Sequence, residues 1–252
     1  MISNQVVLVT GAAGRIGSAI SRAIVFNNGK VILSDIDDVK GRVLSRELGE
    51  EAAVFIQADV TNSNNIDEII DKACTHFGHL DAAVHSAYPR SSAWGTPFES
   101  LKSESLVEDL RLQLGGAILF SQKIIQHFMK QGNGNLIHIS SIQGIAAPKF
   151  DHYIGTEMNS PIEYSAIKSG IIAITRWLAK YYANQNIRVN CISPGGILSE
   201  QPDIFLEKYR ASCTSKGMLD AEDIVGAVIF LLSDASKYIN GQNIILDDGW
   251  SL

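Results

Sequence analysis

Short apolar runs alternate with longer amphipathic segments along the whole chain of 252 residues. The runs are rich in valine and isoleucine and mostly lack polar–apolar alternation, which is typical of parallel strands buried on both faces of a sheet. Strand–helix alternation at this spacing favours right-handed βαβ units. The fold class is therefore α/β, with a doubly wound parallel sheet of about seven strands flanked by helices. The predicted strands are 5–10, 30–35, 52–59, 80–86, 134–141, 187–193 and 242–247, and the predicted helices are 15–28, 38–49, 63–77, 102–131, 163–184 and 220–233.

The composition is that of one globular domain, and it excludes several classes of protein. Acidic residues number 27 against 21 basic ones, a balance that argues against a protein that coats nucleic acid. No apolar run approaches the roughly 18 residues that span a membrane, and the N-terminus lacks a basic signal region. The cysteines Cys74, Cys191 and Cys213 suit neither a disulfide framework nor a zinc site. We therefore expect a single domain over 1–252, a reducing cytoplasmic location, no bound metal, and no nucleic-acid or membrane partner.

Three stretches fit no core element of the predicted sheet: 87–101, 145–162 and 196–218. Each follows the carboxyl end of a predicted strand, and ligands of open α/β sheets bind outside those ends. We expect these segments to wall a substrate pocket. The alternative is that they are ordinary surface loops.

A glycine-rich turn, 10–17, joins the first predicted strand to the first helix. Gly11, Gly14 and Gly17 allow a tight turn and a close approach to a pyrophosphate, whose charge the helix N-terminus favours. Asp35 ends the second strand, 18 residues after Gly17. A carboxylate at that position accepts hydrogen bonds from ribose hydroxyls and repels a 2′-phosphate. The sequence therefore predicts a Rossmann-like dinucleotide site that prefers NAD.

Two neighbouring charges leave part of this cofactor prediction open. Arg15 lies within the turn and can pair with a cofactor phosphate, which keeps NADP as an alternative. Asp59, at the end of the third strand, can bind the adenine amine or instead cap the following helix after Val60.

A tyrosine and a lysine four residues apart suggest proton transfer. Tyr164 and Lys168 share one face of a predicted helix, roughly 6 Å apart along its axis. A free tyrosine has a pKa near about 10, and a neighbouring ammonium lowers that pKa. Ser141, at the end of the preceding strand, supplies a hydroxyl that can orient a carbonyl or alcohol oxygen.

Together these motifs resemble the short-chain dehydrogenase/reductase superfamily. The resemblance rests on the 10–17 turn, Ser141, the Tyr164-Ser-Ala-Ile-Lys168 segment and the Pro-Gly loop 194–199, and it extends to the Asn-Gly and Asp-Asp-Gly segments near the C-terminus. It implies a Rossmann-like fold and an NAD(P)-dependent interconversion of a secondary alcohol and a ketone. It also implies a homo-oligomer, a tetramer or a dimer, built partly on the 163–184 helix.

The resemblance also assigns roles to single residues. Tyr164 is the acid/base, Lys168 lowers its pKa and holds the nicotinamide ribose, and Ser141 orients the substrate. The backbone of Ile197 contacts the nicotinamide amide. The cofactor-binding residues implied by the motifs and the resemblance are Thr10, Gly11, Gly14, Arg15, Ile16, Gly17, Asp35, Asp59, Val60, Ser86, Ala87, Tyr164, Lys168, Pro194, Gly195, Ile197 and Ser199.

The sequence departs from the superfamily pattern in several places. Arg15 stands where a glycine is expected at this chain length, which gives the TGxxGxxG form of longer sugar-nucleotide-modifying members. The family's NNAG segment is replaced by residues 85–88, His-Ser-Ala-Tyr. Gln113 takes the place of the helical asparagine that anchors a proton-relay water. We count Gln113 as a catalytic candidate whose longer side chain puts that relay in doubt.

The choice of the catalytic tyrosine follows from its lysine. Ser141 and Tyr164 are 23 residues apart, more than is usual in the superfamily. Tyr153 falls nearer the usual distance, but Glu157 occupies the position where its lysine should be. We therefore expect Tyr164 to be the acid/base.

The substrate is predicted from the two loops that follow the fourth and fifth strands. The candidate substrate residues are Tyr88, Arg90, Trp94, Lys149 and Tyr153. Aromatic platforms and many hydrogen-bonding groups suit a sugar, a sugar phosphate or a nucleotide sugar better than an acyl chain. Arg90, Lys149, Lys208 or Arg210 can receive a phosphate or carboxylate, although all can equally be solvated loop residues. The 147–172 region also resembles oxidoreductases of flagellin glycosylation and nonulosonic-acid pathways.

Three other functions remain open at this point. They are a 3-oxoacyl-carrier-protein reductase, a sugar-nucleotide epimerase or dehydratase with bound NAD, and a catalytically decayed nucleotide-binding protein. Two histidines lie in predicted strands. We expect His138 to be a packed core residue, whereas His85 lies at the mouth of the expected cofactor cleft and is a candidate for a functional role.

Overall fold

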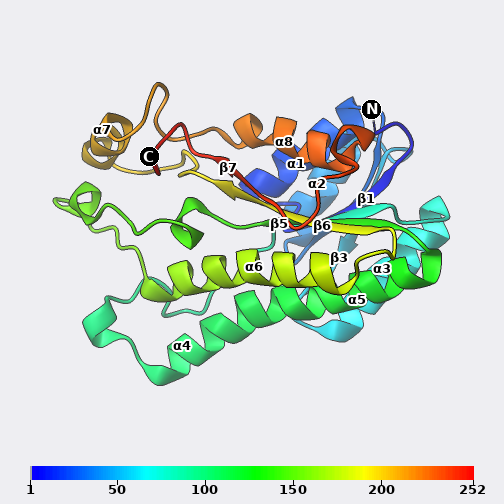
Figure 1. The fold of residues 1–252 in the computed structure, drawn as a ribbon, viewed down its shortest axis with the longest axis horizontal. Coiled ribbons are helices and arrows are strands. Elements are labelled where there is room, and N and C mark those ends of the chain that lie inside the picture. The colour runs from blue at the N-terminus through cyan, green and yellow to red at the C-terminus, as the bar shows by residue number, and fades with distance from the viewer. Residues whose placement is uncertain (1) are drawn as a thin grey trace.

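Seven parallel strands form one sheet in the order β3-β2-β1-β4-β5-β6-β7 (Figure 1). The computed structural model describes residues 2–252. The predicted α/β class and the doubly wound parallel sheet are confirmed. The strands are β1 (Val6–Thr10), β2 (Lys30–Asp35), β3 (Ala53–Gln57), β4 (Ala82–His85), β5 (Gly134–Ile139), β6 (Ile187–Pro194) and β7 (Asn243–Leu246).

The central strand β1 explains why the predicted strands lack polar–apolar alternation. Successive side chains of a strand point to opposite faces of the sheet. Val7 and Val9 join the hydrophobic core on one face, and Val6 and Leu8 join the core on the other. All four are fully buried. A strand with a core on each side must be apolar at every position.

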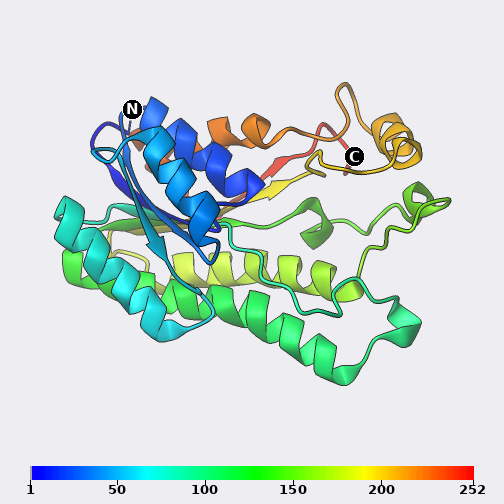
Figure 2. The same cartoon turned by 180° about the vertical axis from the view of Figure 1, so that it is seen from behind.

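Helices cover both faces of the sheet (Figures 1 and 2). One layer consists of α1 (Arg15–Phe26), α2 (Asp38–Leu48) and α8 (Val225–Leu232), and the other consists of α3 (Ser63–Phe77), α5 (Gly116–Gln131) and α6 (Ile162–Tyr181). Two short helices, α4 (Ser103–Asp109) and α7 (Asp203–Ala211), lie beyond the carboxyl ends of the strands. On α6, Trp177 and Tyr181 stack on each other at the surface, with ring centroids 4.5 Å apart. The homo-oligomer that we predict to be built partly on this helix stays a prediction.

Two predicted segments differ from the structure. The helix predicted over 102–131 is divided into α4, a π-helical turn (Leu110–Gly115) and α5. The segment 196–218 is not a loop throughout, because it contains α7. That helix is short and buries little more than Phe205 and Tyr209, one turn apart, so its apolar periodicity is too brief to read from the sequence.

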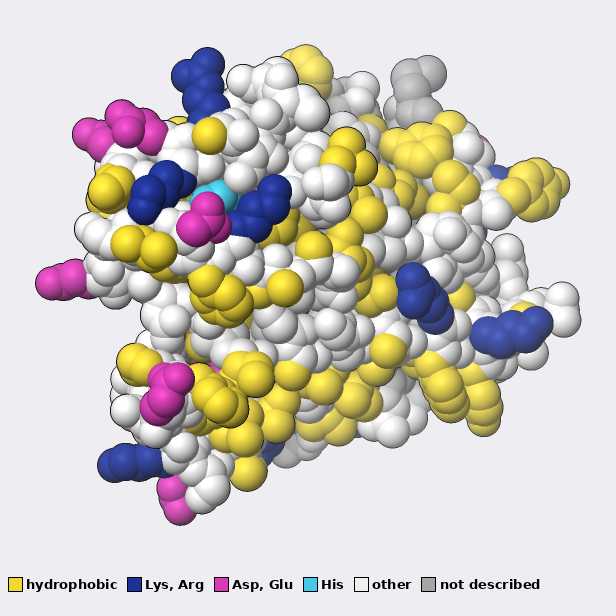
Figure 3. Space-filling view, turned by 60° about the vertical axis from the view of Figure 1, so that its left-hand side comes forward, with side chains coloured by type: hydrophobic (Ala, Val, Ile, Leu, Met, Phe, Trp, Pro, Cys, Tyr) yellow, Lys and Arg dark blue, Asp and Glu magenta, His cyan; other side chains and the backbone are white. Residues whose placement is uncertain are grey.

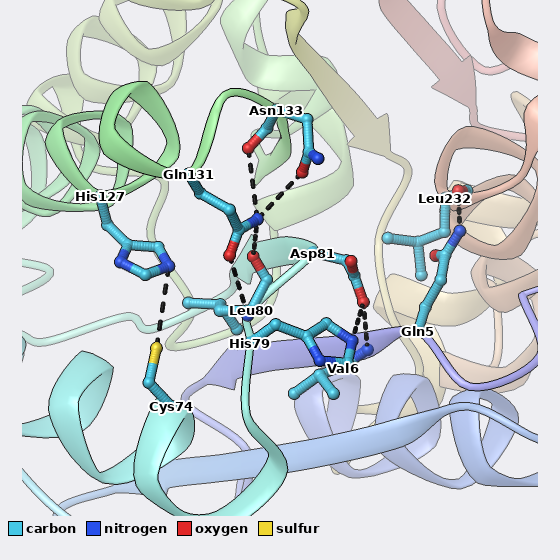
Figure 4. A network of polar contacts seen from close by, with 10 residues as sticks. All are labelled: Gln5, Val6, Cys74, His79, Leu80, Asp81, His127, Gln131, Asn133 and Leu232. Atoms are coloured by element: carbon cyan, nitrogen blue, oxygen red, sulfur yellow. Dashed lines mark hydrogen bonds and ion pairs between the residues drawn. The ribbon is translucent and has the colours of Figure 1, made fainter.

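Polar contacts tie the amino end of β4 to its neighbours (Figure 4). Asp81 accepts a hydrogen bond from the backbone N–H of Val6 at 2.8 Å and lies 3.0 Å from the ring of His79. The side-chain amide of Gln131 bonds both backbone groups of Leu80, at 3.0 and 3.3 Å. These contacts hold the amino end of β4 against β1 and so help to set the relative position of the two strands.

Within residues 2–252, no helix is both long and apolar enough to cross a membrane.

Candidate active site

A cleft of about 1090 Å³ opens at the carboxyl ends of the strands. It lies where the chain order reverses between β1 and β4, the position at which open α/β sheets bind ligands. All three segments 87–101, 145–162 and 196–218 contribute residues to its wall. They extend from the same side of the sheet, the side that carries α7 and α4 (Figure 1). On that side, hydrophobic side chains gather in patches with single charged side chains between them (Figure 3).

The glycine turn gives the cleft an open backbone floor. Gly11 has a φ of +65°, and a Cβ there would meet the backbone of Ala87 at 2.8 Å. A Cβ on Gly17 would lie 2.1 Å from the carbonyl oxygen of Gly11. Gly14 is the N-cap of α1 and lines the cleft, and no side chain of residues 2–252 caps this helix end. Backbone N–H groups therefore face a space that suits a pyrophosphate.

Thr10 does not line the cleft, but its hydrogen bonds hold the start of the glycine turn in place. Its hydroxyl lies 2.9 Å from Nδ1 of His85 and accepts a hydrogen bond from the backbone N–H of Ser86 at 3.2 Å. The hydroxyl of Ser86 donates to the carbonyl of Thr10 at 2.6 Å. Thr10 thus joins β1 to β4, and Ser86 and Ala87 form the adjoining wall.

Asp35 lies at one end of the cleft with its carboxylate held by the backbone. One oxygen accepts from the N–H of Ala13 and the other from the N–H of Asp37, both at 2.9 Å. These bonds fix the carboxylate where an adenosine ribose would lie if the glycine turn held the pyrophosphate. The residues present therefore fit a dinucleotide.

Asp59 and Val60 line the same end. Asp59 accepts hydrogen bonds from the N–H and the hydroxyl of Thr61, at 2.9 and 2.8 Å. The following helix, α3, is capped by Asn62 instead. The alternative role of Asp59 as a helix cap is therefore wrong.

Arg15 reaches from α1 to the loop after β6. It is the first residue of α1, lies beside Ile16 in the cleft wall, and donates to the carbonyl of Leu198 at 3.3 Å. Ser199 does not line the cleft, and its backbone N–H donates to the side chain of Gln201 at 2.7 Å.

The loop after β6 presents the backbone of Ile197 to the cleft. Ile197 forms a parallel bridge with Leu219, in which Leu198 N and Gly196 O make the hydrogen bonds, at 2.7 and 2.8 Å. In such a bridge the N–H and C=O of Ile197 itself point to the opposite side. Its carbonyl there accepts from Gln201 at 3.1 Å, and Pro194 and Gly195 complete the loop wall.

Ser141, Tyr164 and Lys168 meet in the cleft next to this loop. Ser141 follows β5, Tyr164 lies in the first turn of α6, and Lys168 lies one turn later. The ammonium of Lys168 is 5.5 Å from the ring centroid of Tyr164 and donates to the carbonyl of Ile139 at 3.1 Å. The structure therefore brings together the three residues that the sequence selected.

The proton affinities of this group differ from the sequence prediction. Burial raises the pKa of Tyr164, and the hydrogen bond with the Ser141 hydroxyl acts in the opposite direction. Burial also lowers the pKa of Lys168 to about 8. The predicted lowering of the Tyr164 pKa by Lys168 is not found, because desolvation of the phenol dominates.

Tyr153 lines the substrate side of the cleft rather than the catalytic group. Its hydroxyl accepts from Gln143 at 3.5 Å, and the Gln143 carbonyl accepts from Ser160 at 2.7 Å. Burial raises the pKa of Tyr153. It lies on a 3-10 turn (Phe150–Tyr153), separate from α6, whereas Lys168 faces the ring of Tyr164.

Gln113 is buried in the π-helical turn and does not line the cleft. Its side-chain Nε2 has no hydrogen-bond partner among residues 2–252. The assignment of Gln113 to the catalytic group stays a prediction. The neighbouring Leu112 lines the cleft.

Three aromatic rings meet where the first loop passes α6. Tyr88, Trp94 and Tyr164 contact one another edge to face, with centroids 5.5 to 6.0 Å apart. Tyr88 lines the cleft, whereas Trp94 packs behind it and does not. The guanidinium of Arg90 lies 5.4 Å from the ring centroid of Tyr88 and also faces the cleft.

The other basic residues proposed for an anion have different partners. Lys149 lies 4.8 Å from the ring centroid of Trp250 outside the cleft wall. Lys208 donates to the carbonyls of Asp151 and Ile154, at 3.0 and 2.7 Å. Of the four basic candidates, Arg90 alone lines the cleft in the described part of the chain.

His85 is a core residue, which corrects the expectation of a functional role. It is buried on β4, stacks on Phe120 with centroids 4.5 Å apart, and does not line the cleft. Burial lowers its pKa to about 3. His138 is also buried, between the hydroxyls of Ser121 and Thr175 at 2.9 and 2.8 Å, and burial lowers its pKa to about 4.

These two histidines predict a pH dependence of stability. Below about pH 6.5 the unfolded chain binds protons at both rings while the folded protein keeps them neutral. The free energy of unfolding is therefore expected to fall as the pH falls towards about 4, by about 1.4 kcal/mol per pH unit for each histidine. Urea unfolding at a series of pH values measures the slope. The variant His138→Gln should show a shallower slope, and equal slopes in both proteins would contradict the prediction.

The wall of the cleft also contains residues that sequence reasoning missed. They come from the segments after β5 and β6, from α7 and from the C-terminal segment: Gln143, His152, Met158, Gln201, Phe205, Tyr209, Met218 and Trp250. Only the four-residue spacing of Phe205 and Tyr209 is a local signal. The rest are brought together by loop packing, which leaves no periodicity in the sequence.

Comparisons with known proteins agree with this geometry. A family model described as enoyl-(acyl carrier protein) reductase matches residues 11–251. "Post-translational flagellin modification protein A" of Campylobacter coli is 46% identical over 256 residues, which cover 100% of both chains. An L-fucose dehydrogenase of Oryctolagus cuniculus is 30% identical over 99% of this chain and 86% of that protein.

A solved structure gives the same result. The short chain dehydrogenase of Leptospira borgpetersenii, crystallised with bound NAD+, is 32% identical, has a TM-score of 0.86, and is matched over 99% of this chain and 94% of that one. The predicted resemblance, including that to a protein of flagellin modification, is confirmed. The chain belongs to the short-chain dehydrogenase/reductase family, whose members are NAD(P)-dependent oxidoreductases.

Proposed function

We propose that this protein interconverts a secondary alcohol and a ketone on a sugar derivative, with NAD as its preferred cofactor. The observation that carries the proposal is the meeting of Ser141, Tyr164 and Lys168 in one cleft with the glycine turn and the Ile197 backbone. When bound, the nicotinamide supplies or accepts the hydride. The protein supplies position and the proton.

Three residues of the chain have separate roles in the proposed proton transfer. The Ser141 hydroxyl orients the substrate oxygen, and the Tyr164 hydroxyl gives a proton to it or takes one from it. Because burial raises the pKa of Tyr164, the neutral phenol is the resting form and suits proton donation. Lys168, whose amine is held by the Ile139 carbonyl, lies beside the phenol and stabilises the charge that develops on it.

Asp35 supports NAD over NADP. Its carboxylate is fixed at the end of β2 by two backbone N–H groups, so it cannot turn away from a ribose placed there. A 2′-phosphate would be repelled by this charge. Lys40 and Arg15 also line the cleft, but Lys40 pairs with Asp37 at 3.1 Å.

The substrate side supports a sugar derivative with an anionic group. Tyr88, Tyr153 and Trp250 offer aromatic faces, and Gln143 offers an amide. Arg90 is a cation on this wall, whereas the lining carboxylates, Asp35, Asp37 and Asp59, belong to the strand ends at the other end of the cleft. The relative named L-fucose dehydrogenase supports a sugar as the substrate.

The free state of all three cysteines agrees with a reducing cytoplasmic location.

One experiment with two parts tests the proposal. Thermal unfolding is compared with NAD and with NADP, and a larger shift with NADP would overturn the role of Asp35. Turnover is then measured on sugar phosphates, uronic acids, neutral sugars and 3-oxoacyl thioesters. We expect charged sugars to be used and Arg90→Gln to lose the preference for them. Turnover of the thioester alone would favour a 3-oxoacyl-carrier-protein reductase, and cofactor binding with no turnover would favour a decayed enzyme.

A further inference from the structure

The hydroxyl of Tyr209 reaches from α7 to the loop after β6. It accepts a hydrogen bond from the backbone N–H of Gly196 at 2.6 Å. Tyr209 lines the cleft but is only 5% exposed, so little water reaches this bond. A hydrogen bond in such surroundings constrains the backbone more strongly than one at the surface.

The ring that carries this hydroxyl is itself fixed. It stacks on Trp250, with centroids 5.8 Å apart and planes at 21°, and it packs against Phe205 at 5.8 Å. A Cβ on Gly196 would lie 3.1 Å from Cζ of Tyr209 and 2.7 Å from Cε of Met218. The absence of a side chain at residue 196 therefore lets the tyrosine pack closely against the loop.

Gly196 directly precedes the backbone that faces the cleft. Tyr209 holds the N–H of Gly196, and Leu219 N holds its carbonyl at 2.8 Å. Tyr209 thus holds the peptide before Gly196 and Leu219 holds the peptide between Gly196 and Ile197, so the backbone on both sides of Gly196 is fixed. We propose that Tyr209 is a positioning residue for the nicotinamide end of the cofactor, acting through Gly196 and Ile197. The inference rests on the proposed use of a dinucleotide.

The variant Tyr209→Phe isolates the hydroxyl. It keeps the ring against Trp250 and Phe205, but it leaves the N–H of Gly196 without its acceptor. The loop is then expected to spend less time in the orientation that receives the nicotinamide, which lowers the apparent affinity by the same fraction. ADP-ribose contains the adenosine and the pyrophosphate but no nicotinamide, so its binding should not depend on this loop.

Calorimetric titration of the purified protein with NAD and with ADP-ribose tests the inference. For Tyr209→Phe we expect the Kd for NAD to rise about tenfold and the Kd for ADP-ribose to stay unchanged. Tyr238→Phe, at a side chain that is 92% exposed, is the matched control and should bind both ligands like the original protein.

Each other outcome has a distinct meaning. Unchanged binding of NAD to Tyr209→Phe would overturn the inference. An equal loss for both ligands would also overturn it, because that result indicates a general effect on the fold. If the unsubstituted protein binds neither NAD nor ADP-ribose, the proposed dinucleotide function fails and this inference fails with it.

Discussion

Tyr164→Phe is expected to lower turnover by about 10³-fold, within the range of about 10²–10⁴ that a positioned acid/base contributes. The substitution removes only the hydroxyl, so the edge-to-face contacts with Tyr88 and Trp94 remain. Cofactor affinity should therefore be nearly unchanged. Steady-state kinetics on a substrate found in the turnover panel, together with an NAD titration, separate the two quantities.

Tyr153→Phe is the matched control for this experiment. Tyr153 lines the same cleft, but Lys168 does not face it, and its hydroxyl accepts a long hydrogen bond from Gln143. We expect KM to rise a few-fold with kcat largely kept, since one uncharged substrate contact is worth about 0.5–1.5 kcal/mol. Loss of turnover in Tyr153→Phe with activity retained in Tyr164→Phe would reverse the assignment of the acid/base.

Gly17→Ala is expected to abolish measurable cofactor binding and to destabilise the fold by about 1–3 kcal/mol or more. The added Cβ would lie 2.1 Å from the carbonyl oxygen of Gly11, and its other nearest atoms are also backbone atoms, of Gly11 and Ala12, which cannot rotate aside. The turn and the first turn of α1 must then separate, which removes the cradle for the pyrophosphate. Urea unfolding and an NAD titration measure the two effects.

Gly226→Ala provides the comparison. Gly226 lies within α8, and a Cβ there meets no atom of residues 2–252 within 4 Å. Alanine has the better helix propensity, so this variant should be more stable by about 0.5–1 kcal/mol and should bind NAD normally. If Gly17→Ala behaved like Gly226→Ala, the close approach in the turn would have no functional importance.

Much of the site was predictable because its residues belong to local patterns. Gly11, Gly14, Gly17 and Asp35 follow the ends of two strands at fixed distances, and a parallel sheet brings all such ends to one edge. The pair Tyr164 and Lys168 needs only one helical turn to share a face. In each case the neighbours in the sequence dictate the geometry.

The errors arose where burial or packing between distant segments decides. His85 has the same place in the sequence whether it faces the cleft or the core, and only its stacking on Phe120 settles the matter. The helix predicted over 102–131 is interrupted by a π-helical turn that has no signature in the amino acids around it. The pKa of Tyr164 depends on how many atoms surround it, which the position of Lys168 in the sequence cannot reveal.

The sequence by itself therefore determined the parallel α/β sheet, the edge of the sheet at which the cleft opens, and many of the residues that gather in that cleft. Strand period and helix period are local properties, so they can be read without coordinates. Only the tertiary structure decided which side chains form the substrate wall and that Tyr209 holds the loop of Gly196. Those contacts join segments far apart in the chain, and their free energy comes from packing that no short stretch of sequence encodes.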